Sequence, residues 1–207
     1  METQISIEAL RLIAARSIID EFTVAIDSIS IKPSFSQAVD SILNCRGKII
    51  CTGIGKAGIA ISKFSSILCS FGIPSCYLHP TESQHGNLGL ISPNDILFIA
   101  STSGKTREIL EIIDLARNIN VKEVIGITSH LDSPIRDKVD IVIDMGVIKE
   151  AGHLRIAPTS SILVMMAITD ALALVAAQEK GLTLEGYGKF HHGGYLGAIA
   201  RKKKSIQ

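Results

Sequence analysis

The stretch that decides the fold is 95–108, which reads DILFIASTSGKTRE. After Asp95 comes a continuous apolar run, which is typical of a strand covered on both faces of a sheet. Hydroxyl and glycine residues follow, and a helical pattern begins near Lys105. A buried strand that leads through a short polar loop into a helix is the repeating unit of a parallel α/β sheet.

The same unit recurs on both sides of this stretch. Further apolar runs predict strands at 48–52, 76–79, 124–128 and 141–144. Helical patterns at 56–71, 105–119 and 132–138 separate most of the strands, and a long apolar helix is expected at about 158–180. The sequence therefore predicts an α/β protein in which helices cover both faces of a five-stranded parallel sheet.

The chain of 207 residues suits one domain. We expect N-terminal helices within 3–45 to pack on an α/β core at 46–199, followed by a basic tail at 200–207. A glycine-rich segment at 186–197 is expected to form a mobile functional loop around His191, His192, Gly193 and Gly194.

Composition excludes several classes of partner. The net charge is only +1, so no overall field attracts nucleic acid or an anionic membrane. The chain has no Trp and 4% aromatic residues, which leaves few surfaces for stacking bases. The apolar segment 161–177 carries Asp170 near its middle, which favours a buried or interface helix over a membrane span. The N-terminus shows no signal peptide, and we expect a cytoplasmic protein.

The strand ends indicate where the chemistry lies, because open parallel sheets bind ligands beyond the carboxyl ends of their strands. One such loop carries four hydroxyls, from Ser101, Thr102, Ser103 and Thr106. Short hydroxyls at a helix N-terminus are suited to a phosphate group. The alternative is an ordinary helix cap, which needs only one of them.

A glycine turn follows the first predicted strand. The motif GIGKAG places Gly55 and Lys56 at a helix start, where Lys56 is either a ligand-binding residue or a plain surface lysine. No acidic residue occurs between Gly58 and Glu82, so the motif lacks the ribose ligand of a dinucleotide site.

Acid–base groups complete the pattern. Glu150 follows the last predicted strand, and Thr159, Ser160 and Ser161 lie at the start of the long helix. Glu108 is expected to face the same cavity as the hydroxyl loop. Carboxylates, a lysine and a histidine around a phosphate loop suit proton transfer on a phosphorylated small molecule.

Five motifs in this order resemble the arabinose-5-phosphate isomerases of the sugar isomerase (SIS) family: GIGKAG, HPTESQHGNLG, STSGKTREI, KEAGHLRIAPTSS and FHHGGYLG. The resemblance covers about 40–199. It implies a flavodoxin-like fold with strand order 2-1-3-4-5, a homotetramer, and no cofactor. It also implies interconversion of D-ribulose 5-phosphate and D-arabinose 5-phosphate through a cis-enediolate, the first step toward Kdo of lipopolysaccharide and capsules. We expect a short form without the CBS domains of many relatives.

The resemblance also assigns site residues. It implies catalytic roles for Lys56, Glu108, Glu150 and His191. It places substrate contacts at His79 and His85, and near Gly72 and Ile73. Zinc is not required, although His79 could take an adventitious ion. Thr102, Lys105 and Asn87 depart from the usual motifs, which leaves the exact sugar phosphate open.

Other functions remain as alternatives. The chain could isomerise another sugar phosphate, or act as a non-catalytic module that senses one. We also hypothesise that CMP-Kdo or Kdo, which carry anionic groups, binds at the active site and competes with substrate.

Overall fold

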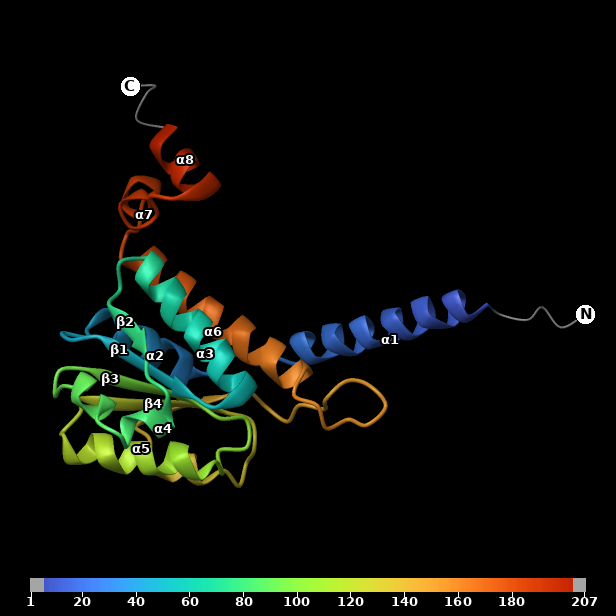
Figure 1. Cartoon of the computed structure of the whole chain (residues 1–207), viewed down its shortest axis with the longest axis horizontal. Helices are drawn as coiled ribbons and strands as arrows, with labels where there is room; N and C mark the ends of the chain where they lie inside the picture. The colour runs from blue at the N-terminus through green and yellow to red at the C-terminus, as the bar shows by residue number, and fades with distance from the viewer. Residues whose placement is uncertain (1–5, 203–207) are drawn as a thin grey trace, which may run out of the picture.

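The computed structural model describes residues 6–202 and confirms the predicted sheet. Five parallel strands lie in the order β2-β1-β3-β4-β5 (Figure 1). Their bounds are β1 Ile49–Gly53, β2 Ser75–Tyr77, β3 Ile96–Ala100, β4 Glu123–Thr128 and β5 Ile141–Asp144. Every residue of β1 and β3 is buried, as their continuous apolar runs predict for strands covered on both faces.

A buried carboxylate fixes the pairing of the two central strands, in which Ile49 of β1 lies opposite Ile96 of β3. Asp95 accepts hydrogen bonds from the backbone N–H of Lys48 at 2.9 Å, from Lys48 Nζ at 2.7 Å and from the N–H of Ser92 at 2.8 Å. Burial favours the neutral acid, but these donors outweigh it and lower the pKa of Asp95.

Helices cover both faces of the sheet, as predicted. One face carries α2 Pro33–Leu43, α3 Gly55–Ser70 and α6 Ser160–Glu179, and its core includes Phe64 packed on Phe98 with ring centroids 4.9 Å apart. The other face carries α5 Arg107–Asn118, packed through residues such as Ile109 and Ile112. The remaining short elements are α4 Pro80–Ser83 and the 3₁₀ turns η1 Asn87–Leu90 and η2 Pro134–Asp137. The helix predicted at 132–138 is therefore only a 3₁₀ turn.

The long apolar helix α6 is a core helix. By length and composition it could cross a membrane, but ten of its residues are buried within the structure. It packs against α1, α2 and α3. Asp170, near its middle, forms an ion pair with Lys63 of α3. The apolar character of α6 is thus explained by packing against its neighbours.

The N-terminal helix α1 Ile7–Asp27 packs far less than expected. Only Ala25 of this helix is buried, and most of α1 projects from the body (Figure 1). Its exposed apolar side chains include Ile7, Leu10, Ile13 and Ile19. Of the helices expected within 3–45, α2 packs on α6 and β5, whereas α1 contacts α6 and projects from the body over most of its length.

The expected glycine-rich loop is instead largely helical. Helices α7 Leu184–Phe190 and α8 Gly194–Lys202 occupy this segment, and His191 to Gly193 only join them. Thr183 caps α7 by accepting a hydrogen bond from the N–H of Gly186 at 3.0 Å. Both helices lie beyond the C-terminal end of α3 (Figure 1). The basic tail begins within α8, and 203–207 lie outside the described residues.

Candidate active site

A cavity of about 790 Å³ lies beyond the carboxyl ends of the central strands. It brings together seven of the predicted residues. They are Gly55, Lys56, Ser101, Thr102, Ser103, Thr106 and Glu150. Residues that follow three different strands, and the first turn of α3, thus line one cavity, as the parallel sheet requires.

The hydroxyl loop follows β3 and leads into α5. Ser101 Oγ accepts a hydrogen bond from the N–H of Gly104 at 3.0 Å and lies 3.3 Å from the hydroxyl of Thr106. Ser103 Oγ accepts from the N–H of Lys105 at 3.3 Å. Thr106 occupies the N-cap position of α5, yet its side chain does not cap that helix. The loop therefore offers an uncapped helix N-terminus to an anion.

Glycine at position 104 is required by close packing. Gly104 has a φ of +64°, and a Cβ there would lie 1.6 Å from Ser133 Oγ. Ser133 Oγ lies 3.2 Å from the hydroxyl of Thr128, which donates to the carbonyl of Thr102 at 3.1 Å. The hydroxyl loop is thus held against the end of β4.

The polar cavity residues that sequence reasoning did not assign include Ser129 and His130. Their backbone N–H groups donate to the carbonyl of Thr102 at 3.0 and 3.3 Å, which places both beside the hydroxyl loop. They directly follow a predicted buried strand, and this position alone indicates that they lie at the ligand-binding edge of the sheet. Lys149 and Arg155 also line the cavity and were not singled out.

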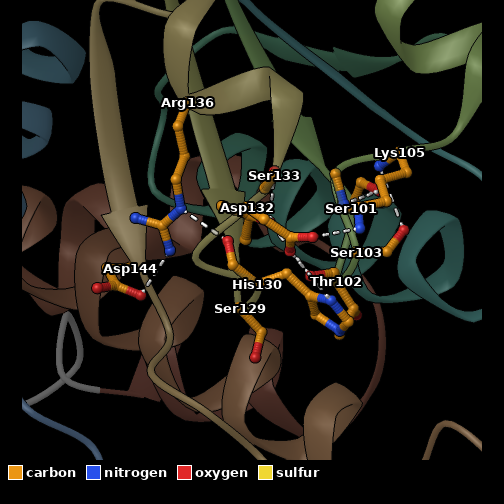
Figure 2. A network of polar contacts seen from close by, with 12 residues as sticks. Ser101, Thr102, Ser103, Lys105, Ser129, His130, Asp132, Ser133, Arg136 and Asp144 are labelled. Atoms are coloured by element: carbon orange, nitrogen blue, oxygen red, sulfur yellow. Dashed lines mark hydrogen bonds and ion pairs between the residues drawn. The ribbon is translucent and has the colours of Figure 1, made fainter.

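Lys105, the cation within the loop sequence, is engaged outside the cavity. Its Nζ pairs with Asp132 at 2.6 Å, and this contact lowers the pKa of Asp132. Asp132 also lies 3.9 Å from Nδ1 of His130 (Figure 2). Lys105 therefore fastens the hydroxyl loop to the loop after β4.

Glu150 is held by the N-terminus of α6. One carboxylate oxygen accepts from the N–H of Thr159 at 2.8 Å and from the N–H of Ser161 at 3.3 Å, and the other contacts the hydroxyl of Ser161. Positive helix ends complement negative charge, so these donors fix the carboxylate in place.

Thr159, Ser160 and Ser161, which the sequence assigns to substrate binding, do not line the cavity. Thr159 and Ser161 position Glu150 instead. Ser160 is buried, and within the described chain its hydroxyl has no partner.

Lys56 lies exposed in the first turn of α3 and lines the cavity. It forms no ion pair within residues 6–202. Gly53 and Gly58 allow the start of α3 to lie against the end of β1, because a Cβ on Gly58 would lie 2.8 Å from the carbonyl oxygen of Gly53. The ammonium group is thus available to a ligand.

Glu108 does not line the cavity, although the sequence predicted that it would. It lies in the first turn of α5, whose core face is formed by Ile109 and Ile112. Side chains three apart share a helix face, and Glu111 accepts a hydrogen bond from Gln84 after α4 at 2.6 Å. Glu108 therefore lies on the flank of α5 that faces α4.

His191 lies at the other end of α3 from the cavity. Its ring stacks on Tyr187 with centroids 4.4 Å apart, and Tyr187 lies 6.3 Å from the ring of Phe71. Phe71 follows the C-terminal end of α3, whereas Lys56 is at its start. At 1.5 Å per residue, the 16 residues of α3 separate these ends by about 24 Å.

The remaining predicted contacts also lie outside the cavity. His79 caps α4 by accepting from the N–H of Thr81 at 3.3 Å, and His85 is exposed. Gly72 accepts from Lys180 Nζ at 2.6 Å, and Ile73 is buried in the core. Among the residues that the structure describes, no group of three or more His, Cys, Asp or Glu side chains is placed to hold a metal ion.

Fold and site together define a sugar-isomerase type of domain. The family model for the SIS domain matches residues 42–175, and the chain belongs to this family. It is 36% identical over 163 residues to the arabinose 5-phosphate isomerase KpsF of Escherichia coli, covering 79% of this chain and 51% of that one. It is 34% identical over 175 residues to KdsD of Pseudomonas aeruginosa, covering 84% and 53%. The chain thus spans about half the length of these relatives.

Solved structures agree with the fold. A Bacteroides fragilis phosphosugar isomerase involved in capsule formation is 37% identical, with a TM-score of 0.86 over 89% of this chain and 99% of that one. The Escherichia coli CFT073 protein c3406, solved in complex with arabinose 5-phosphate, is 28% identical, with a TM-score of 0.84 over 90% and 100%.

Proposed function

We propose that this chain is an aldose–ketose isomerase that interconverts D-ribulose 5-phosphate and D-arabinose 5-phosphate. The observation that carries the proposal is one cavity lined by a helix-held carboxylate, Glu150, a free ammonium group, Lys56, and a loop of hydroxyls at 101–106. The relatives named arabinose 5-phosphate isomerase support the choice of substrate.

The phosphate binds at the hydroxyl loop. Ser101, Ser103 and Thr106 provide donors, and the start of α5 adds backbone N–H groups and the positive end of the helix. Anchoring one end of an open-chain sugar in this way leaves its carbonyl end to reach the other walls of the cavity.

Glu150 acts as the base. It takes a proton from one of the two carbons C1 and C2 and returns it to the other, through a cis-enediolate, while the hydroxyl proton passes between O1 and O2. Lys56 stabilises the negative oxygen that develops during the transfer. The oxidation of one carbon balances the reduction of the next, so the reaction consumes no redox cofactor.

Neither His191 nor Glu108 lines the cavity of its own subunit, so in the assembled oligomer His191 opens the sugar ring and Glu108 orients substrate or Lys56 of a second copy. Because His191 lies about one length of α3 from its own cavity, it must serve the cavity of a second copy. The exposed apolar residues of α1 also call for a partner surface. We therefore propose a homotetramer in which residues 46–199 form the SIS core of each subunit.

The product supplies Kdo for lipopolysaccharide or capsule in the cytoplasm. CMP-Kdo or Kdo then acts as a feedback ligand, because its anionic groups fit the donors around the cavity. Competition with substrate in steady-state kinetics is the expected form of this inhibition.

The direct test is incubation of the purified chain with D-ribulose 5-phosphate, followed by NMR. We expect D-arabinose 5-phosphate to accumulate to equilibrium, and a Glu150→Gln variant to form it about 10²–10⁴-fold more slowly. Turnover of only a hexulose or heptose phosphate would assign another substrate. Binding without turnover of any of these sugars would favour a sensing module.

A further inference from the structure

Arg155 adopts a backbone conformation that side chains other than glycine rarely take. Its φ is +50°, and Asn120 is the other non-glycine residue with a positive φ within residues 6–202. Such strain persists where the surrounding structure requires it, and it is concentrated at functional sites. The position of Arg155 on the wall of the cavity therefore calls for an explanation.

A turn and a carboxylate hold Arg155 in this conformation. The N–H of Arg155 donates to the carbonyl of Gly152 at 3.2 Å. The N–H of Gly152 in turn donates to Glu21 of α1 at 3.3 Å, and the same Glu21 oxygen lies 3.8 Å from the guanidinium of Arg155. The base of α1 thus fastens the loop between β5 and α6 at this point (Figure 1).

Arg155 lies on the boundary of two cavities. It lines the candidate active site and a second cavity of about 520 Å³ between α1 and the loop. Its side chain is 58% exposed, and its contact with Glu21 is long for an ion pair. Glu21 therefore orients the guanidinium, and the guanidinium remains available to a ligand.

The loop also places Arg155 on the wall of the same cavity as Glu150, the proposed base. Arg155 follows Glu150 by five positions on the same loop, and both line the cavity. The hydroxyl loop that suits phosphate lies on a different segment, where Lys105 is already paired with Asp132. A planar guanidinium presents several donors at once, which suits neighbouring oxygens of a sugar.

We propose that Arg155 is a substrate-binding residue that donates hydrogen bonds to the sugar oxygens near the reacting carbons, and that Glu21 is its positioning residue. The proposal rests on the proposed function. The left-handed backbone is what directs the side chain to this wall, so the strain is retained for binding.

Arg155→Gly is the decisive variant, because glycine accepts a positive φ and removes only the side chain. Loss of a charged hydrogen bond to substrate should lower kcat/KM by about tenfold or more, while the melting temperature stays level or rises. Asn120→Gly is the matched control: it relieves a similar backbone on the exposed end of α5, and its kcat/KM should stay within about twofold of wild type. Glu21→Gln should raise KM with little change in kcat.

A folded Arg155→Gly variant with kcat/KM within about twofold of wild type overturns the proposal. An equal loss in Asn120→Gly overturns it as well. Should Arg155→Gly fail to fold, Arg155→Asn replaces it, because asparagine also tolerates a positive φ and lacks the guanidinium, and the same thresholds apply. If the wild type turns over no pentose phosphate, the proposed function fails, and calorimetric binding of D-arabinose 5-phosphate then decides the role of Arg155. About tenfold weaker binding by the variant supports that role, and equal or absent binding by both proteins rejects it.

Discussion

Nε of Arg136 donates a hydrogen bond to the carbonyl oxygen of His130 at 2.8 Å, so a half-buried arginine positions a residue of the cavity wall (Figure 2). The same guanidinium donates to Asp144 at the end of β5 at 2.9 Å. Asp144 also accepts from Lys32, just before α2, at 2.6 Å and from the N–H of Gly146 at 3.0 Å. One carboxylate therefore ties His130, β5 and α2 together.

Asp144→Asn should destabilise the protein in a pH-dependent way. Burial would raise the pKa of Asp144, but the donors from Lys32, Gly146 and Arg136 outweigh it and lower the pKa to about 2. A depressed pKa contributes stability that is complete above the unfolded value near 4 and is lost as the pH falls toward 2. We expect Asp144→Asn to cost about 2 kcal/mol at pH 7 and progressively less between pH 5 and pH 2.

Urea unfolding of both proteins across this pH range measures the difference. Asp114→Asn is the control, because the pair of Asp114 with Lys138 lies on the surface with 62% of the Asp114 side chain exposed. Its cost should stay below about 1 kcal/mol at every pH. A cost for Asp144→Asn that does not change with pH would contradict this account of Asp144.

Glu150→Gln should abolish most of the proposed activity while keeping the fold. The amide has the shape of the carboxylate but cannot act as the base, so kcat should fall by about 10²–10⁴-fold, the usual range for acid–base catalysis. Glu179→Gln, at the exposed end of α6, should leave kcat unchanged. Stopped assays followed by NMR compare the two variants, and a kcat for Glu150→Gln near that of the control would exclude Glu150 as the base.

Gly104→Ala should disrupt the hydroxyl loop. The new Cβ would meet Ser133 Oγ and would also hold an unfavourable positive φ. We expect a loss of about 2 kcal/mol or more in unfolding free energy, together with weaker phosphate binding. Gly181→Ala, also at a positive φ but with open space around its Cβ, should cost only about 1 kcal/mol. Equal costs for the two variants would show that Ser133 does not restrict Gly104.

Mixed oligomers should reveal whether His191 serves a neighbouring subunit. Glu150→Gln retains His191, and His191→Ala retains Glu150, so each variant alone should be nearly inactive. Unfolding and refolding the two variants together should restore a fraction of wild-type activity, because some sites then combine Glu150 of one subunit with His191 of another. The control refolds each variant by itself. A mixture no more active than its components would place His191 outside the neighbouring cavity.

The sheet and the strand-end loops could be predicted because both follow from local chemistry. Runs such as that of Ile96 to Ala100 need cover on both faces, and the parallel sheet that results directs Ser101 and Glu150 to one edge. The cavity residues Ser129 and His130 could have been found by the same rule. Arg155 could not, because its direction depends on a positive φ and on Glu21, which lies far away in the sequence.

The structure differs from two expectations for physical reasons. Glycines at 186, 188 and 193 indicated a loop, but the Thr183 cap and packing on α3 stabilise the short helix α7. The hydroxyls of Thr159 and Ser161 were assigned to the substrate, because the sequence does not show that Glu150 reaches them first. Hydroxyl-rich helix starts satisfy internal carboxylates as readily as external anions.

The hydrogen bonds and ion pair between Asp95 and Lys48 have a consequence for how the chain folds. They join the starts of two central strands across 47 positions of sequence, so a long loop must close before β1 and β3 can pair. Folding that depends on such distant contacts is slow. An Asp95→Asn variant that refolds more slowly in stopped-flow dilution from urea would show that this ion pair forms early and selects the register; an unchanged refolding rate with faster unfolding would show that it forms only after the strands have met.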